Sequence, residues 1–222
     1  WLVSSYMPTH PKEAALKKII IVINQVFNYA MSKKLCTGNP AQFIVFRDFV
    51  KGCDLTKKLP EDRAFSDKDA ERLQEDALKT PDNPRSLMRI FAKETGMRAA
   101  ELSALHRSDI QGDFIHVHRQ LIKDPTTKPQ TYREVGYSKD ERQHPHNGRL
   151  VPITPAMNDI IALAKALPGE SDYLFHDKAG KAITPDSYEK HLRRACKKLG
   201  ISTSNNHAFR VALNSQYIDK EL

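Results

Sequence analysis

The spacing of apolar residues changes twice along this chain, and that change limits the folds it can adopt. Over residues 13–34, apolar residues recur every three or four positions, which predicts one long helix. Ile115, Val117 and Leu121 then alternate with polar residues, so the period becomes two, as in a strand. Helical spacing returns after residue 155. The sequence therefore predicts a mainly α chain with a small antiparallel β-sheet, an α+β fold.

Short local signals predict where individual elements begin and end. Serine or threonine caps, some followed by proline, begin helices, and a glycine ends them. Ser66 with Asp69 has the capping-box pattern, and Gly96 and Gly200 are the predicted stops. The predicted elements are helices beginning at 66 and 84, helices at 99–106, 155–167, 185–199 and from 207, and extended segments at 115–121, 131–138 and 150–153.

A polar, non-periodic stretch at 51–65 separates the first helical region from the rest and is interpreted as an interdomain linker. We therefore expect a partial helical domain at 1–50 and a second domain at 66–222. Trp1 is not an initiator methionine, and we expect the chain to begin inside a longer protein.

Composition favours an acidic partner. The 222 residues carry a formal net charge of +8 and a pI near 9.3, which suits nucleic acid most simply. The longest apolar run, 19–23, is far short of the roughly 20 residues of a membrane span. Three cysteines without close pairing favour reduced thiols in a cytosolic protein. No histidine pair has a carboxylate or cysteine set at ligand spacing, so no metal or other cofactor is expected.

A His-x-x-Arg pattern near the end of the chain is the first candidate site. His207 and Arg210 fall at the start of a predicted helix, where backbone N–H groups and the helix dipole favour an anion. The spacing alone does not select this pair, because the chain holds three other examples: His116/Arg119, His146/Arg149 and His191/Arg194. The first is expected on a strand, the second contains a turn glycine, and the third lies inside a basic helix.

Arg98 is the second candidate, at a tight junction between two predicted helices. Its planar guanidinium suits bidentate hydrogen bonds to a phosphate. An ordinary surface ion pair with Glu101 is the alternative interpretation.

The order of these segments resembles the tyrosine recombinase family of phage and conjugative-transposon integrases. The resemblance is carried by Thr-Gly-Met-Arg-x-x-Glu-Leu-x-x-Leu-x-x-x-Asp-Ile from Thr95, a β-hairpin, Val-Pro-Ile-Thr-Pro, and His-x-x-Arg at His207. It runs from about Ser66 to Leu222, while residues 1–50 look like the end of the family's core-binding domain.

The resemblance implies a mechanism in which a tyrosine attacks a DNA phosphate, giving a 3′-phosphotyrosyl link and a free 5′-hydroxyl. Arg98 and Arg210 would hold the non-bridging oxygens, with Glu101 supporting Arg98, and His207 would assist hydrogen bonding or proton transfer. Lys139 would protonate the leaving oxygen, although Lys123 and Lys128 are also in the region. The family tyrosine would lie beyond Leu222, and the fragment would then bind DNA without cleaving it. Tyr217 is expected to pack in the core.

The resemblance also implies double-stranded DNA as partner, a homo-oligomer on that DNA in the full-length protein, and a cytoplasmic, DNA-associated location for a protein encoded by a bacterium or a phage. Eight basic residues are candidate DNA contacts: Lys17, Lys18, Lys33, Lys34, Lys190, Arg193, Arg194 and Lys197. A DNA-binding module without cleavage and an RNA-binding or phosphodiesterase domain remain as alternatives.

Overall fold

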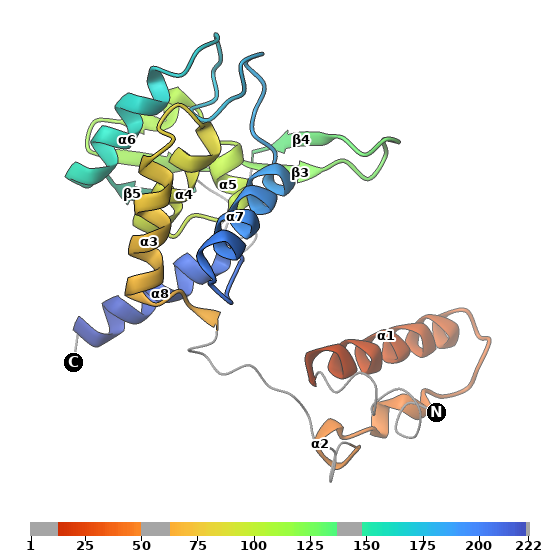
Figure 1. Ribbon diagram of the computed structural model, residues 1–222. Helices are drawn as coiled ribbons and strands as arrows, with labels where there is room; N and C mark the ends of the chain where they lie inside the picture. The colour runs from red at the N-terminus through yellow and green to blue at the C-terminus, as the bar shows by residue number, and fades with distance from the viewer. Residues whose placement is uncertain (1–12, 50–62, 137–147, 221–222) are drawn as a thin grey trace. The chain divides into compact units, whose positions relative to one another are not determined.

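The computed structural model describes residues 13–49, 63–136 and 148–220 (Figure 1). The chain divides into two compact units, residues 1–59 and 60–222, and each is considered by itself. The boundary between them falls inside the predicted linker, most of which lies outside the described residues.

The first unit is built on the long helix that the sequence predicts. Asn39 holds the following turn against this helix, because its buried side chain donates to the Asn24 and Asn28 side-chain oxygens at 3.0 and 2.8 Å. The Asn39 Oδ1 also accepts from the Ala41 N–H at 2.9 Å, which begins the next helical turn. The elements are α1 (Glu13–Ser32), η2 (Pro40–Phe43) and α2 (Phe46–Phe49).

Several helices of the second unit begin at the predicted caps, and two end at the predicted glycines, whereas the helix predicted at 155–167 ends at Lys165. The Ser66 hydroxyl accepts from the Asp69 N–H at 3.1 Å, and Thr154 and Thr184 cap their helices in the same way. Gly96 and Gly200 end helices in the left-handed region, with φ of 59° and 69°. The bounds are α3 (Asp67–Leu78), α4 (Pro84–Thr95), α5 (Ala99–Ser103), η4 (Arg107–Asp109), α6 (Pro155–Lys165), α7 (Pro185–Leu199) and α8 (His207–Lys220).

The predicted helix at 99–106 is shorter than expected. It ends at Ser103 because a separate 3-10 turn follows, in which the Asp109 carboxylate accepts from the His106 N–H at 2.8 Å. This side chain competes with continuation of the helix for the backbone donor.

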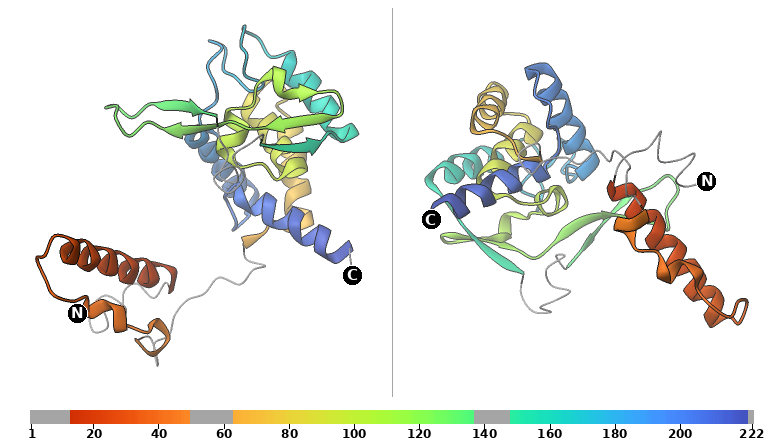
Figure 2. Two further views of the ribbon diagram at one scale, coloured as in Figure 1. Left: turned by 180° about the vertical axis from the view of Figure 1, so that it is seen from behind. Right: turned by 90° about the horizontal axis from the view of Figure 1, so that it is seen from below.

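The strands form two antiparallel sheets rather than one. One is ordered β1-β2-β5 and the other pairs β3 with β4, whose ribbon extends away from the other strands (Figure 2). The predicted continuous strand at 115–121 was wrong, because the chain leaves the first sheet at His118 and Arg119. The bounds are β1 (Ile110–Gln111), β2 (Phe114–Val117), β3 (Gln120–Lys123), β4 (Tyr132–Val135) and β5 (Arg149–Pro152).

Helix α4 lies at the centre of the second unit, in contact with α3, α6, α7 and α8 (Figure 1). Its residues Leu87, Met88 and Phe91 are fully buried. The Phe91 ring packs edge-on against the Phe175 ring, with 5.4 Å between the ring centroids. Because α4 is buried on most sides, it holds the turn at Gly96, at its C-terminal end, in a fixed position. The mainly helical α+β prediction is confirmed.

Candidate active site

The turn between α4 and α5 positions Arg98. Gly96 ends α4 with a positive φ, and Arg98 then stands at the N-cap position of α5. The Glu101 carboxylate reaches back to this residue: Oε2 accepts from the Arg98 N–H at 2.9 Å, and Oε1 accepts from its Nη1 at 2.7 Å. Glu101 is 1% exposed, whereas the Arg98 side chain is 31% exposed. The pair is therefore not the surface ion pair that the sequence left open.

A second arginine reaches the same carboxylate from β5. Arg149 donates from Nη1 to Glu101 Oε1 at 3.0 Å and from Nη2 to Oε2 at 2.7 Å, which is the parallel two-bond geometry of an arginine–carboxylate pair. Burial alone would raise the pKa of Glu101, but the hydrogen bonds and charge of Arg149, with the Arg98 hydrogen bonds, hold that pKa below its ordinary value. Glu101 is therefore an anion shared by two cations.

Asn206 ties the start of α8 to the Arg98 turn. Its buried side chain donates from Nδ2 to the Met97 carbonyl oxygen at 2.7 Å and accepts from the Tyr188 hydroxyl at 2.8 Å. Met97 directly precedes Arg98, and Asn206 directly precedes His207. The two candidate motifs, far apart in sequence, are thus joined through one buried amide.

The close approach at Gly96 brings Arg210 to the same place. A Cβ on Gly96 would lie 3.5 Å from the Arg210 Cα and 3.2 Å from Leu213 Cδ2. Beside this contact lies an open cavity of about 250 Å³, lined by Arg149, Arg210 and the end of α4. Two arginines and one carboxylate, Glu94, therefore line this cavity.

His207 is the exposed first residue of α8, a position where helix N–H groups favour an anion. The structure therefore brings Arg98, Glu101, Arg210 and the backbone of His207 into one region. Lys139 lies outside the described residues, between β4 and β5, and its role stays a prediction. Tyr217 lies on α8, but its side chain is also outside them.

Sequence reasoning missed Arg149 as a member of this region. It belongs to the His146/Arg149 pattern, which we set aside because of the turn glycine. Its position at the start of the extended segment before Val151-Pro152 could have marked Arg149 as a candidate. No local feature of the sequence indicated that its partner is Glu101.

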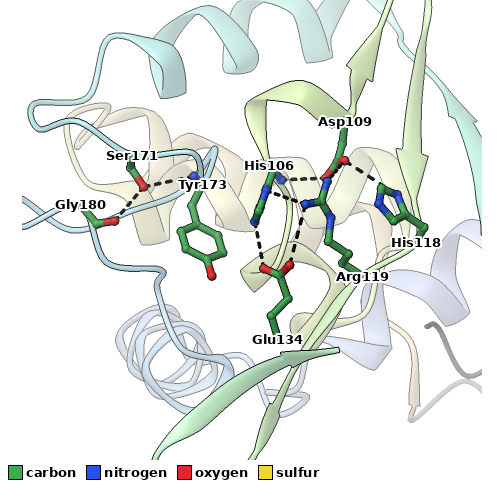
Figure 3. A network of polar contacts seen from close by, with 8 residues as sticks. All are labelled: His106, Asp109, His118, Arg119, Glu134, Ser171, Tyr173 and Gly180. Atoms are coloured by element: carbon green, nitrogen blue, oxygen red, sulfur yellow. Dashed lines mark hydrogen bonds and ion pairs between the residues drawn. The ribbon is translucent and has the colours of Figure 1, made fainter. Parts of the chain in front are cut away.

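A second ionic cluster, also missed, anchors the β3–β4 pair (Figure 3). Arg119 at the break between β2 and β3 pairs with Asp109 and meets His106 Nδ1 at 2.6 Å. His106 Nε2 lies 2.9 Å from the Glu134 carboxylate on β4, and the Tyr173 ring packs edge-on against His106. A two-stranded ribbon is marginal by itself, so this cluster supplies part of what holds it in place.

The predicted DNA-contacting residues of α7 lie on its surface. Lys190, Arg193, Arg194 and Lys197 are all exposed, whereas the neighbouring Lys198 is engaged with Asp76 at 2.7 Å.

Lys17 and Lys18 on α1, and Lys33 and Lys34 in the turn that follows it, are exposed as well. Lys17 pairs with Glu13, and the Lys33 ammonium lies 5.7 Å from the centre of the Tyr29 ring. These lysines belong to the first unit, two near the start of α1 and two just past its end.

Metal ligands and membrane spans are considered for the described residues alone. Among them, no group of three or more histidine, cysteine, aspartate or glutamate side chains is arranged to hold a metal ion. No helix in the described ranges is long and apolar enough to cross a membrane.

Comparisons with known proteins concern the family and the fold. The model described as the phage integrase family matches residues 64–222. No protein of curated function matches the chain by sequence.

Solved structures share the fold at low sequence identity. The Tn1549 transposon integrase, in complex with circular intermediate DNA, is 16% identical with a TM-score of 0.69, and the match covers 95% of this chain and 68% of that one. The same integrase with transposon right end DNA gives a TM-score of 0.75 at 15% identity and the same coverage. A λ integrase dimer bound to a core site is 17% identical with a TM-score of 0.61, covering 89% of this chain and 62% of that one. With a family model matched over well more than half of its length, the chain belongs to the phage integrase family, a family of tyrosine recombinases.

Proposed function

We propose that this chain binds duplex DNA and holds one backbone phosphate between Arg98 and Arg210. It would do so as part of a recombinase that cleaves and rejoins DNA strands through a 3′-phosphotyrosyl link. The observation that carries the proposal is the junction at Gly96, where the turn bearing Arg98 packs directly against the Arg210 segment of α8. Family membership supports the reaction class, and the residue roles rest on this local geometry.

Positive charge at the site would stabilise the phosphate during strand transfer. Transfer of a DNA strand builds negative charge on the non-bridging phosphate oxygens, and catalysis consists largely of positioning and stabilising that charge. Arg98 and Arg149 with Glu101 carry a net charge of about +1, and Arg210 adds another. Arginines stay charged at every relevant pH and donate in a planar fork that matches a phosphate.

Proton transfer would involve two further residues, His207 and Lys139. His207, exposed at the N-terminus of α8, would donate a hydrogen bond or move a proton at the phosphate. Lys139 would protonate the leaving 5′-oxygen. The attacking tyrosine is assigned to none of the described residues.

DNA affinity would come mainly from exposed basic side chains. Lys190, Arg193, Arg194 and Lys197 on α7 are suited to backbone phosphates, and the four exposed lysines of the first unit would add a second set of contacts. Such contacts release counterions, so affinity should fall by orders of magnitude between about 50 and 200 mM salt. Assembly into a homo-oligomer on DNA belongs to the same proposal.

Fluorescence anisotropy tests the binding part, with a labelled duplex and a single-stranded RNA of the same sequence at matched salt. Tighter binding of the duplex supports the proposal, and weaker binding by Arg98→Gln and Arg210→Gln supports the phosphate site. Preference for the RNA would refute it in favour of an RNA-binding domain.

Cleavage is tested in the full-length protein with a nicked duplex that traps covalent protein, run on a denaturing gel. A covalent adduct that is lost in Arg98→Lys supports the assigned mechanism, because an ammonium cannot replace the guanidinium fork. An adduct formed at the wild-type rate by Arg98→Lys would refute the role of Arg98. Duplex binding without any adduct would favour a DNA-binding module over a cleaving one.

A further inference from the structure

The Glu101 carboxylate is shared unequally between its two arginines. Arg149 engages both oxygens through a fork, at 3.0 and 2.7 Å. Arg98 contributes its backbone N–H to one oxygen and the single guanidinium nitrogen Nη1 to the other. An ionised carboxylate offers about four lone-pair sites, and these four hydrogen bonds fill them.

We propose that Arg149 is a positioning residue for Arg98. By occupying both oxygens of Glu101, Arg149 limits the hold of this carboxylate on the Arg98 side chain to one nitrogen. The Arg98 side chain then stays partly exposed rather than drawn onto both oxygens of the buried carboxylate. The consequence for phosphate binding rests on the proposed function of Arg98, but the effect on the conformation of Arg98 does not.

Burial makes the competition unavoidable. Glu101 is 1% exposed, so water cannot replace a lost partner, and a buried carboxylate left without a cation is strongly destabilising. If the Arg149 fork is removed, the nearest donor is Arg98, three residues earlier and already bonded to Oε1. Its side chain, 31% exposed, would turn inward to satisfy both oxygens. The guanidinium would thereby be withdrawn from the ligand.

The arrangement also explains why two arginines are needed at one carboxylate. A single arginine paired with Glu101 would give a neutral unit, whereas two leave one positive charge for a phosphate. Lysine at position 149 would keep that charge without the fork. Geometry and charge can therefore be separated by substitution.

The test follows the Arg98 guanidinium in the ¹⁵N-labelled chain by NMR, with sulfate as a tetrahedral dianion probe. The Arg98 Nε–H signal is assigned by its loss in Arg98→Lys. In Arg149→Gln, we expect this signal to be displaced before any sulfate is added. Sulfate affinity should fall about tenfold, the loss of roughly one charge-assisted hydrogen bond. Arg149→Lys should shift the signal in the same direction with a smaller loss of affinity.

Two further variants exclude a long-range charge effect and a purely structural role, and Arg149→Lys, which keeps the charge, excludes a local charge effect. Arg133→Gln removes one exposed positive charge on β4 without touching Glu101, and its sulfate affinity should stay within about twofold of wild type. Adding Glu101→Gln to Arg149→Gln removes the competing carboxylate, so sulfate affinity should recover to within about threefold. A purely structural role of Arg149 would produce no such recovery.

The proposal is overturned if folded Arg149→Gln leaves the Arg98 signal in place, or if the double variant binds sulfate as weakly as the single one. If Arg149→Gln does not fold, Arg149→Lys takes its place, with the displacement of the Arg98 signal and the sulfate affinity as the two measurements. A wild-type chain whose Arg98 signal ignores sulfate would instead count against the phosphate site itself. The displacement of that signal in sulfate-free Arg149→Gln still decides the positioning.

Discussion

Replacing Asn206 by alanine should be among the most destabilising single changes in the second unit. The amide of Asn206 donates to the Met97 carbonyl oxygen and accepts from the Tyr188 hydroxyl, and both of these residues are almost completely buried. Each buried polar group that loses its partner costs about 1–3 kcal/mol. With two such groups, Asn206→Ala should lower the free energy of unfolding by about 2–5 kcal/mol.

Urea denaturation followed by circular dichroism measures this loss, with an unchanged m-value showing that the unfolding reaction is the same. Tyr188→Phe removes only the hydroxyl, and should cost about 1 kcal/mol. The double variant should be less destabilised than the sum by about 1–2 kcal/mol, because both single changes break the same bond. Asn158→Ala, on the exposed face of α6, is the matched control and should change stability by less than about 0.5 kcal/mol.

An Asn206→Ala chain within about 0.5 kcal/mol of wild type would refute the reasoning. So would strict additivity with Tyr188→Phe. Because Asn206 adjoins His207 and bonds the residue before Arg98, the variant should also bind duplex DNA more weakly than Tyr188→Phe does. Equal DNA affinity in the two variants would mean that the amide supports the fold and not the site.

Three other predictions concern single positions. Gly96→Ala should cost about 2 kcal/mol or more in thermal unfolding, against about 1 kcal/mol for Gly200→Ala. Both glycines have positive φ, but only a Cβ at Gly96 would press on Leu213, at 3.2 Å, so equal losses would contradict the close packing. Burial raises the pKa of the Cys196 thiol to about 11, so a thiol reagent at pH 8 should modify it only on the unfolding timescale. The folded pKa of Glu101 is depressed below 4.5, so the stability that Glu101 contributes is present above that pH and is lost as the pH falls through the folded pKa. Glu101→Gln should therefore make the fall of the unfolding free energy with decreasing pH shallower. An unchanged slope would count against the buried ion pairs.

Much of the secondary structure could be predicted because its signals are local. Caps at Ser66, Thr154 and Thr184 and stops at Gly96 and Gly200 depend on contacts within about four residues. The strand break at Arg119 could not be predicted in this way. Ile115, Val117 and Leu121 keep the same parity across the break, so the alternation continues while the chain changes sheet. The long helix α1 shows a related limit, since Val26 and Met31 fit the apolar pattern but remain exposed in the structure.

The sequence by itself determined the residue types of the candidate site and the order in which they occur: Arg98 after a helix stop, with His207 and Arg210 at the start of a last helix. Only the tertiary structure decided which charges meet. Arg149 reaches Glu101 across 48 residues because β5 pairs with β2 and sets Arg149 opposite Val117. Asn206 reaches Met97 across 109 residues because α8 packs on the end of α4. The partner of a buried charge depends on how distant segments pack against one another. That packing is determined by the contacts of the whole core together, so a short stretch of sequence does not predict the partner.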